Sequence, residues 1–357
     1  MKILGIETSC DETSVAIVED GRKVLANVIY SQIPLHALTG GVVPEVAARE
    51  HVVKMVPVLD EALKKAKCDW DDISAIAITQ GPGLISSLII GTQAANTISF
   101  VKNKPLIPVQ HIVGHIYSNW LYGPDVSENE IDEISFPALV LTVSGGHNDI
   151  ILMRGHHKFK VLGETLDDAA GEAFDKVARI LGLGYPGGPA ISKIAANGNA
   201  SRFKLPRSFL EKGSLNFSFS GIKTAVLREV QKHSKIDEQF KADMSASFQE
   251  AVTDVFVQKT LSALEQNPKV KEFMLAGGVS ANTRIRSALA AALPLDVKFR
   301  FPKAISYCTD NAAMIAAAGY FLHKLHPRRY KPSTNIVPTM SFEIYGLFLH
   351  GKMDKLC

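Results

Sequence analysis

Two histidines, at positions 111 and 115, are the residues whose type and spacing most directly suggest chemistry. They stand in the segment HIVGH, with only small or apolar residues between them. On a helix, residues four apart share one face with Cβ atoms roughly 5–6 Å apart, so two imidazoles there could bind one metal ion. The alternative is a helix that uses both side chains only for capping and packing. The spacing alone leaves both interpretations open.

A catalytic metal site usually has three protein ligands and one open position, so the histidine pair needs a third ligand. Asp310 in YCTDNAAM is the candidate, because it precedes a helix of small apolar residues. Asp310 could equally be the N-cap of that helix. A zinc-protease helix would need H-E-x-x-H, and Ile112 stands where the glutamate should be. The sequence therefore lacks the general base of a metalloprotease.

Two segments repeat one pattern of strands and turns that would position such residues. The first begins ILGIETSCDETSVAIV at Ile3 and the second begins ALVLTVSGGHNDIILM at Ala138. Each predicts a strand, a polar turn, a second strand, a glycine hairpin and a third strand. An amphipathic helix then follows, at 44–66 in the first half and 167–183 in the second. This duplication predicts two similar α/β lobes that face each other across a cleft.

The polar turns SCDETS and SGGHN would both face that cleft. Turns rich in serine and glycine expose backbone N–H groups, so a facing pair is typical of a phosphate clamp. Each turn alone could also be an ordinary hairpin turn. Glycine turns in YPGGP and LAGGVSAN would let a nucleoside approach the backbone. Within the second of these, we expect Ser280 to cap the helix that begins at Thr283.

Composition restricts the class of protein. A chain of 357 residues with 46% hydrophobic and 21% charged residues is typical of a soluble protein of two domains. No apolar run reaches the roughly 20 residues of a membrane helix, and no leader precedes the first strand. The four cysteines form no CxxC pair, so we expect a cytoplasmic protein without a disulfide framework. With a net charge of +3, any nucleic-acid binding must depend on local basic clusters.

Ten motifs in order resemble the bacterial tRNA threonylcarbamoyltransferase family, TsaD, over essentially all of residues 1 to 340. They are MKILGIETSCDET, GGVVPEVAAREH, QGPGL, HIVGH, TVSGGH, DDAAGEAFDK, YPGGP, SFSGIKT, LAGGVSAN and YCTDNAAM. The resemblance implies an α/β fold of the duplicated, two-lobed actin/Hsp70/sugar-kinase (ASKHA) type, with the active site in the inter-lobe cleft. It implies an N-terminal lobe (1–133, joined by a C-terminal helix at 312–340), a C-terminal lobe (134–311, with a helical insertion at about 164–262) and a non-family tail (341–357).

The resemblance also assigns roles to individual residues. His111, His115 and Asp310 would bind one divalent ion, Fe²⁺ or Zn²⁺. Substrate contacts would come from Thr142, Val143, Ser144, Gly145, Gly146, Asp175, Gly188 and Asn282. Beside the first polar turn, Asp11 and Glu12 could orient the accepting amine or act as the base. They could as easily be solvated turn carboxylates.

Family members transfer a threonylcarbamoyl group from threonylcarbamoyl-AMP to N6 of the adenosine 3′ of the anticodon in tRNAs that read ANN codons. The product is N6-threonylcarbamoyladenosine (t6A). The implied partners are tRNA, a TsaB-like paralogue and a TsaE-like ATPase, with a homodimer as the alternative assembly and no membrane. ATP, ADP or AMP are further ligands expected in the cleft. From the sequence itself, the basic residues that could contact tRNA phosphates are Lys158, Lys160, Lys324, Arg328, Arg329 and Lys331. Each of these basic clusters alone is more typical of a solvated charged face.

Two other classes of protein remain open on the same fold. One is an ATPase or sugar kinase, although Mg²⁺ for phosphoryl transfer prefers oxygen ligands to histidine. The other is a nucleotide-binding scaffold of the Hsp70 kind, for which the residues after Ser341 are too few to form a peptide-binding domain. For the tail from Glu343 to Cys357, the sequence leaves open whether it docks or frays.

Overall fold

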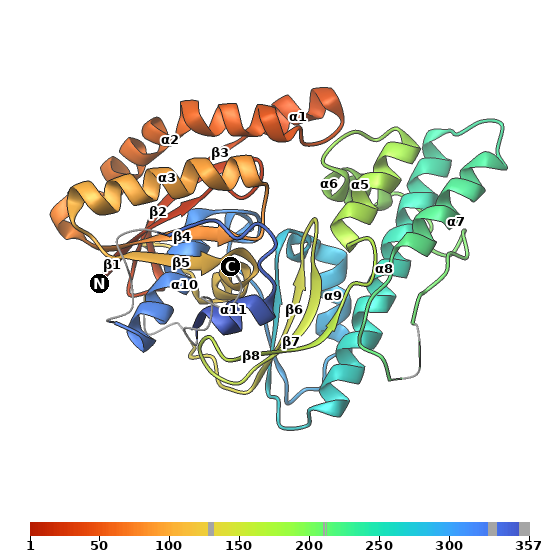
Figure 1. Ribbon diagram of the computed structural model, residues 1–357. Helices are drawn as coiled ribbons and strands as arrows, with labels where there is room; N and C mark the ends of the chain where they lie inside the picture. Colours follow the sequence, from red (N-terminus) through yellow and green to blue (C-terminus); the bar gives the residue numbers. More distant parts are fainter. Residues whose placement is uncertain (128–131, 210, 212, 328–333, 350–357) are drawn as a thin grey trace. The chain divides into compact units, whose positions relative to one another are not determined.

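The computed structural model describes residues 1–127, 132–209, 211, 213–327 and 334–349 (Figure 1). The chain divides into two compact units. The first unit consists of Met1–Pro34, Val42–Glu133 and Pro302–Cys357, and the second of Leu35–Gly41 and Ile134–Phe301. The lobe boundaries expected from the sequence, at 133 and 312, stay a prediction. By compactness, residues 302–311 also go with the first unit and 35–41 with the second.

The first unit is built on a five-stranded mixed sheet in the order β3-β2-β1-β4-β5. Its strands are β1 (Lys2–Glu7), β2 (Glu12–Glu19), β3 (Lys23–Ser31), β4 (Ile73–Gly81) and β5 (Leu106–Gln110). The first three strands pair antiparallel, whereas β1, β4 and β5 are parallel to one another. The carboxyl ends of these three parallel strands therefore meet at one edge of the sheet. In open α/β sheets this edge is where ligands usually bind.

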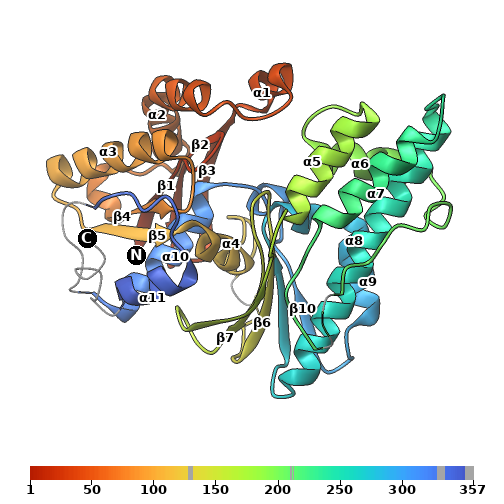
Figure 2. The same cartoon turned by 45° about the vertical axis from the view of Figure 1, so that its right-hand side comes forward.

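Helices cover both faces of this sheet (Figures 1 and 2). On one face, α2 (Pro44–Ala66) and α3 (Ile85–Lys102) bury apolar side chains against β1, β2 and β4. On the other face lies α10 (Ala312–Leu325). A Cβ atom added to Gly5 would lie 2.2 Å from the Ala312 carbonyl oxygen, so the glycine lets the start of α10 approach β1 closely. The shorter helices are η1 (Trp70–Asp72), α4 (His111–Tyr117), η2 (Ser118–Trp120), η5 (Ile305–Tyr307) and α11 (Phe342–Leu349).

The second unit repeats the topology of the first. Its sheet has the order β8-β7-β6-β9-β10, in which each strand takes the place of its counterpart in the first sheet, β3-β2-β1-β4-β5. Its strands are β6 (Ala138–Val143), β7 (Asn148–Met153), β8 (Phe159–Glu164), β9 (Glu272–Ala276) and β10 (Lys298–Arg300). Again the first three strands, β6, β7 and β8, pair antiparallel, whereas β6, β9 and β10 are parallel to one another. The duplication that the sequence predicts is therefore present at the level of the fold.

Helices of the second unit pack on its sheet around α8 (Glu238–Gln266), most of whose length is buried. The others are α5 (Ala170–Leu181), α6 (Gly187–Ala195), α7 (Ser220–Gln231), η4 (Gly278–Ala281) and α9 (Thr283–Ala292), while α1 (Ile33–Thr39) lies where the chain first passes between units. The predicted cap of α9 is wrong. Because η4 intervenes, Ser280 lies inside that turn, and Asn282 caps α9 by accepting from Arg284 N and Ile285 N.

Part of the C-terminal tail is ordered as a helix. Residues 342–349 form α11, in which the Tyr345 side chain is only 1% exposed. This segment therefore packs on the protein, and the rest of the tail, 350–357, lies outside the described residues. None of the helices in the described part of the chain is long and apolar enough to cross a membrane.

Candidate metal centre and substrate-binding turns

The two histidines project from α4, a short helix that follows β5 without a linker. Gln110 ends β5 and also caps α4, because its side chain accepts a hydrogen bond from Val113 N at 2.7 Å. Neither histidine is therefore needed as a cap. Both histidine residues are buried, at 8% exposure for His111 and 1% for His115. Their position after β5 places them at the carboxyl edge of the three parallel strands.

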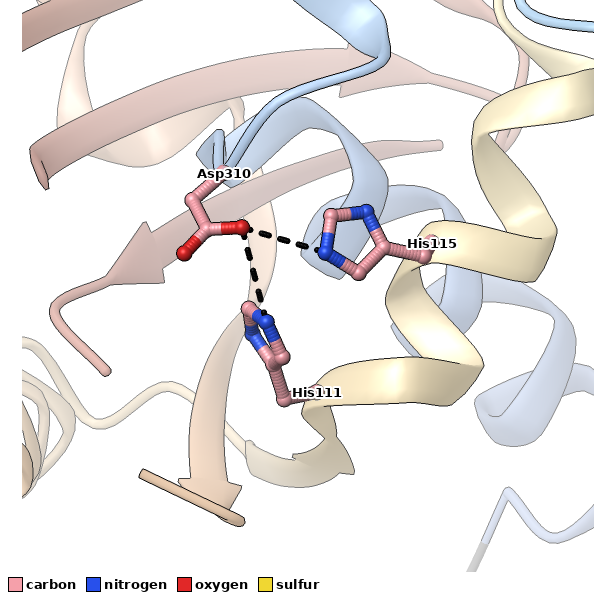
Figure 3. Close-up of side chains that lie close together, drawn as sticks. All are labelled: His111, His115 and Asp310. Atoms are coloured by element: carbon pink, nitrogen blue, oxygen red, sulfur yellow. Dashed lines mark ion pairs between the residues drawn. The ribbon is translucent and has the colours of Figure 1, made fainter. Parts of the chain in front are cut away.

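Asp310 reaches both imidazoles from the residues that precede α10 (Figure 3). Its Oδ1 lies 3.1 Å from His115 Nε2 and 3.5 Å from His111 Nε2. The ligand atoms of the three side chains all lie within 4.8 Å of one another. The cap of α10 is Asn311, which accepts from Met314 N at 3.1 Å. The alternative that Asp310 is only a helix cap is therefore wrong, because its neighbour holds that position.

Glu7, at the end of β1, orients His111, and the sequence reasoning missed it. Its Oε2 lies 3.1 Å from His111 Nδ1, and Ser9 Oγ lies 3.2 Å from the same nitrogen. The carboxylate has no exposed surface, and Thr79 Oγ1 and Ser9 N each donate a hydrogen bond to it. A carboxylate on one imidazole nitrogen keeps the proton there and leaves the other nitrogen free to bind a metal. The sequence did contain one indication of this role, because Glu7 is an ionisable residue at the end of the otherwise mainly apolar strand KILGIE.

The residues of this cluster fit a divalent transition metal. Apart from the ion pair with Asp310, neither ring nitrogen of His115 has a hydrogen-bond partner among the described residues. Leaving a buried polar group unsatisfied costs on the order of 1–3 kcal/mol, which coordination of a metal would offset. Two imidazole nitrogens and one carboxylate oxygen are ligands that suit Zn²⁺ or Fe²⁺.

The electrostatics of the cluster favour a positive charge. Burial lowers the pKa of His111, but the nearby carboxylates Asp310 and Glu7 outweigh burial and raise that pKa to about 9. Burial, followed by the negative charges of Asp11 and Asp310, raises the pKa of Glu12 well above its usual range. The site thus holds protons tightly in the absence of a cation. A bound divalent ion would replace them.

The acidic turn after β1 is fixed by α2. His51 is buried, and its Nε2 donates to the Cys10 carbonyl oxygen at 2.9 Å while its Nδ1 accepts from Thr13 Oγ1 at 2.8 Å. Burial lowers the pKa of His51, which favours the neutral ring that this pair of bonds requires. Asp11 is 7% exposed and Glu12 is half-buried, so they are not the solvated turn carboxylates of the alternative interpretation.

The residues assigned to the substrate all lie in the second unit, beginning at the carboxyl end of β6. Thr142 and Val143 end that strand, and residues 144–146 form the turn that follows. This turn lies against the start of α5, because the Ser144 and Gly145 carbonyl oxygens accept hydrogen bonds from the first N–H groups of the helix, at 3.3 and 3.1 Å. These hydrogen bonds therefore fix the turn at residues 144–146 relative to α5.

Two further residues assigned to the substrate, Asp175 and Gly188, are linked through the contact between α5 and α6. The carboxylate of Asp175 in α5 accepts a hydrogen bond from Gly187 N at 2.7 Å, which fixes the YPGGP turn where α6 begins. Gly188 is the next residue of that helix. Asp175 thus positions the turn that carries Gly188, a role that its place in AFDK did not suggest.

Two Gly-Gly pairs, Gly187-Gly188 and Gly277-Gly278, each combine one glycine that packing requires with one that leaves open space. A Cβ on Gly187 would lie 2.5 Å from the backbone of α5, and one on Gly277, whose φ is +88°, would lie 2.4 Å from the Val143 carbonyl oxygen. Close backbone packing therefore requires the first glycine of each pair. A Cβ on Gly188 or Gly278 would meet nothing within 4 Å. The second glycine of each pair leaves open space beside the backbone, which is what a bound nucleotide needs.

Of the basic residues assigned to tRNA, Lys158, Lys160 and Lys324 are exposed. Arg328, Arg329 and Lys331 lie outside the described residues.

Comparison with known proteins identifies the family. Residues 23–317 match the family described as TsaD, tRNA N6-adenosine threonylcarbamoyltransferase. A curated relative of that name from Symbiobacterium thermophilum is 49% identical over 345 residues, covering 96% of this chain and 98% of the relative. A relative of the same name from Bacillus subtilis is 51% identical over 322 residues, covering 89% of this chain and 90% of the relative.

Solved structures of lower identity share the fold. A full-length HypF structure has a TM-score of 0.56 at 14% identity, covering 92% of this chain and 56% of that chain. Component A of the (R)-2-hydroxyglutaryl-CoA dehydratase of Acidaminococcus fermentans has a TM-score of 0.50 at 17% identity, covering 90% of this chain and 98% of that chain.

Two mixed sheets of the same topology, each with its helices, define a member of the ASKHA class of folds. Within that class, the chain belongs to the TsaD family of tRNA N6-adenosine threonylcarbamoyltransferases, and it is a transferase. The fold and the family expected from the sequence are confirmed. The roles assigned to individual residues stay predictions.

Proposed function

We propose that this chain transfers the threonylcarbamoyl group from threonylcarbamoyl-AMP to N6 of the adenosine 3′ of the anticodon, forming t6A in tRNAs that read ANN codons. The observation that carries this proposal is the cluster of two buried histidines, His111 and His115, with the partly buried Asp310 in a chain of the TsaD family. In the transfer, the N6–carbonyl bond forms, the bond from the carbonyl carbon to the phosphate oxygen breaks, and AMP leaves with that electron pair.

This chemistry requires positioning more than a protein nucleophile. The acyl phosphate is already activated, whereas adenine N6 is a weak nucleophile. Holding the two together can lower the barrier by up to roughly 7–11 kcal/mol in ideal cases. The proton that leaves N6 would pass to Asp11 or Glu12, which lie in the turn fixed by His51.

His111, His115 and Asp310 would hold one Fe²⁺ or Zn²⁺ ion, with Glu7 orienting His111. An ion bound there would supply Lewis-acid polarisation of the threonylcarbamoyl carbonyl. The AMP part would bind in the second unit, along the turn 142–146 and beside the open faces of Gly188 and Gly278. ADP or ATP would share this part of the site.

We also propose a TsaB-like paralogue as a protein partner, docking on α2 and α3. These helices lie side by side over the first sheet (Figure 1). They expose a group of apolar side chains. The group consists of Val52, Val53, Val56, Ile85 and Ile89, each between 42% and 70% exposed. Burying these side chains in a partner interface would remove them from water.

Replacing Val53 and Val56 by Asp should abolish binding to the paralogue while leaving metal content unchanged. A second copy of this chain on the same face would instead support the homodimer.

The test measures transfer of labelled threonylcarbamoyl from its adenylate to unmodified tRNA, with metal content measured in the same sample. The chain is assayed alone and with TsaB-like and TsaE-like proteins. We expect transfer to be lost on chelation and in His115→Ala, while a control on an exposed histidine, His233→Ala, remains active. Transfer that appears only when the other proteins are added would place this chain as the catalytic subunit of a complex.

Two outcomes would overturn the proposal. ATP hydrolysis without any transfer would favour the ATPase or kinase alternative. Nucleotide binding without turnover of either substrate would favour the scaffold.

A further inference from the structure

Asn282, one of the residues assigned to the substrate, has no side-chain hydrogen bond left to offer. Its Oδ1 accepts from Arg284 N at 2.9 Å and from Ile285 N at 3.1 Å, which caps α9. Its Nδ2 donates to Ser192 Oγ at 2.9 Å and to Gln249 Oε1 at 2.8 Å. An amide has two donor hydrogens and one acceptor oxygen with two lone pairs, so Asn282 is fully used inside the protein.

Ser192 is used in the same way. Its hydroxyl accepts from Asn282 Nδ2 and gives its one hydrogen to Gln249 Oε1 at 2.9 Å. The three side chains come from three different elements of the second unit, with Ser192 on α6, Gln249 on α8 and Asn282 before α9. They form a closed cluster in which each member holds the other two.

The orientation of the Gln249 amide follows from this cluster. The backbone N–H groups of α9 require the Asn282 oxygen to face them, so the Asn282 nitrogen must face Gln249. The Gln249 atom that receives this donor must be its oxygen, and its Nε2 therefore points away from the cluster. Gln249 is 8% exposed as a residue, and its Nε2 makes no hydrogen bond to the described residues. Of the three side chains, only Gln249 keeps free donor hydrogens.

We propose that Gln249 is a further substrate-binding residue, whose Nε2 donates a hydrogen bond to an acceptor on the nucleotide part of the substrate. The acceptor is a ribose hydroxyl oxygen or a ring nitrogen of adenine. Ser192 stands one turn of α6 after Gly188, whose missing side chain leaves open space. This inference rests on the proposed function, because it takes the nucleotide to bind along these turns. Asn282 and Ser192 then act as positioning residues that hold the donor outward.

The test separates the two halves of the amide. Gln249→Glu keeps an oxygen for Ser192 and Asn282 but replaces the outward donor. At pH 8 we expect it to bind AMP about 10-fold more weakly, the effect of losing one buried hydrogen bond, with an unchanged unfolding temperature. Gln258→Glu places the same charge on an exposed position of the same helix and should bind AMP as the wild type does.

Analogues of AMP distinguish a hydrogen bond from simple charge repulsion. 2′-Deoxy-AMP, 3′-deoxy-AMP and the 1-, 3- and 7-deaza analogues each remove one acceptor. One of them should weaken binding to the wild type but not to Gln249→Glu, and that analogue identifies the acceptor. Equal losses for AMP and every analogue would indicate repulsion and overturn the inference.

The outcomes also separate this inference from the proposed function. AMP affinity that is unchanged in Gln249→Glu, in a protein that binds AMP and transfers the group, overturns only the role of Gln249. A wild-type protein that neither binds AMP nor transfers the group overturns both.

Discussion

Glu7 is a fully buried carboxylate whose negative charge is balanced through His111, so its removal tests the metal centre without removing a ligand. We expect Glu7→Gln to weaken metal affinity by about 10–100-fold, because the amide cannot hold the His111 ring as an anion does. Competition with a chelator of known affinity measures the effect. Glu19→Gln, at the end of β2, is the matched control. Equal affinity in both variants would show that Glu7 only packs.

Asp149 in β7 gives a pH-dependent prediction of stability. It is 7% exposed and accepts a hydrogen bond from Thr142 Oγ1 at 3.0 Å. Burial, only partly opposed by that bond, raises its pKa from 3.8 to about 6. A carboxyl group with a raised pKa favours folding while it is protonated, below about pH 4, and this contribution is lost as the pH rises through about 6.

Asp149→Asn removes this titration and keeps an oxygen for Thr142. The free energy of unfolding of the variant, relative to the wild type, should therefore increase between pH 4 and pH 7. The increase should be up to about 3 kcal/mol, since one pKa unit corresponds to about 1.4 kcal/mol. Denaturant unfolding at the two pH values measures it. A difference that stays constant across this range would contradict the buried, protonated carboxyl.

At the scale of residues, the sequence predicted the cluster of His111, His115 and Asp310 better than the residues around it. His111, His115 and Asp310 could be assigned through the resemblance, and the structure brings them together. Glu7 was missed because its contact with His111 joins residues more than a hundred positions apart, through the pairing of β1, β4 and β5. No local pattern reports such a contact.

At the scale of elements, the Gly277-Gly278 pair gives a prediction that separates packing from ligand binding. Gly278→Ala should fold normally, because a Cβ there meets nothing within 4 Å, yet it should bind AMP at least about 10-fold more weakly by filling the space of the ligand. Gly277→Ala should instead lower stability by about 1–3 kcal/mol, because its φ is +88° and the Val143 carbonyl oxygen is too close. Thermal unfolding and AMP titration of both variants check this. The reverse pattern would show that the second glycine packs and the first faces the ligand.

Helices with a clear polar face were predictable, and buried ones less so. The helix expected at 44–66 is α2, and the helix expected from Thr283 is α9. The central helix α8 is buried on most sides, and such a helix shows little periodicity to distinguish it in a sequence. The error at Ser280 has a similar origin, because a short 3-10 turn carries no hydrophobic pattern of its own.

For the whole molecule, the two units share a topology but differ in the chemistry at corresponding edges. The first carries the histidine–aspartate cluster and the second carries the glycine turns. Added Zn²⁺ should therefore slow amide hydrogen exchange in α4 and at the start of α10, whereas AMP should slow it at residues 142–146, 187–188 and 277–278. A ligand at 100 times its Kd stabilises the state it binds by about 2.7 kcal/mol, which exchange can detect. Protection of the same peptides by both ligands would contradict separate sites.

Gly5 extends the metal centre to a residue that touches none of its ligands. A methyl group there would stand 2.2 Å from the Ala312 carbonyl oxygen, so α10 would have to retreat by about 1 Å to restore ordinary contact. Asp310 is attached to that end of α10, and metal–ligand distances tolerate only about ±0.2 Å. A methyl group at Gly5 would therefore displace Asp310 relative to the two histidines by more than a metal site tolerates. A substitution at Gly5 could therefore change which metal ion binds while the three proposed ligands stay in place.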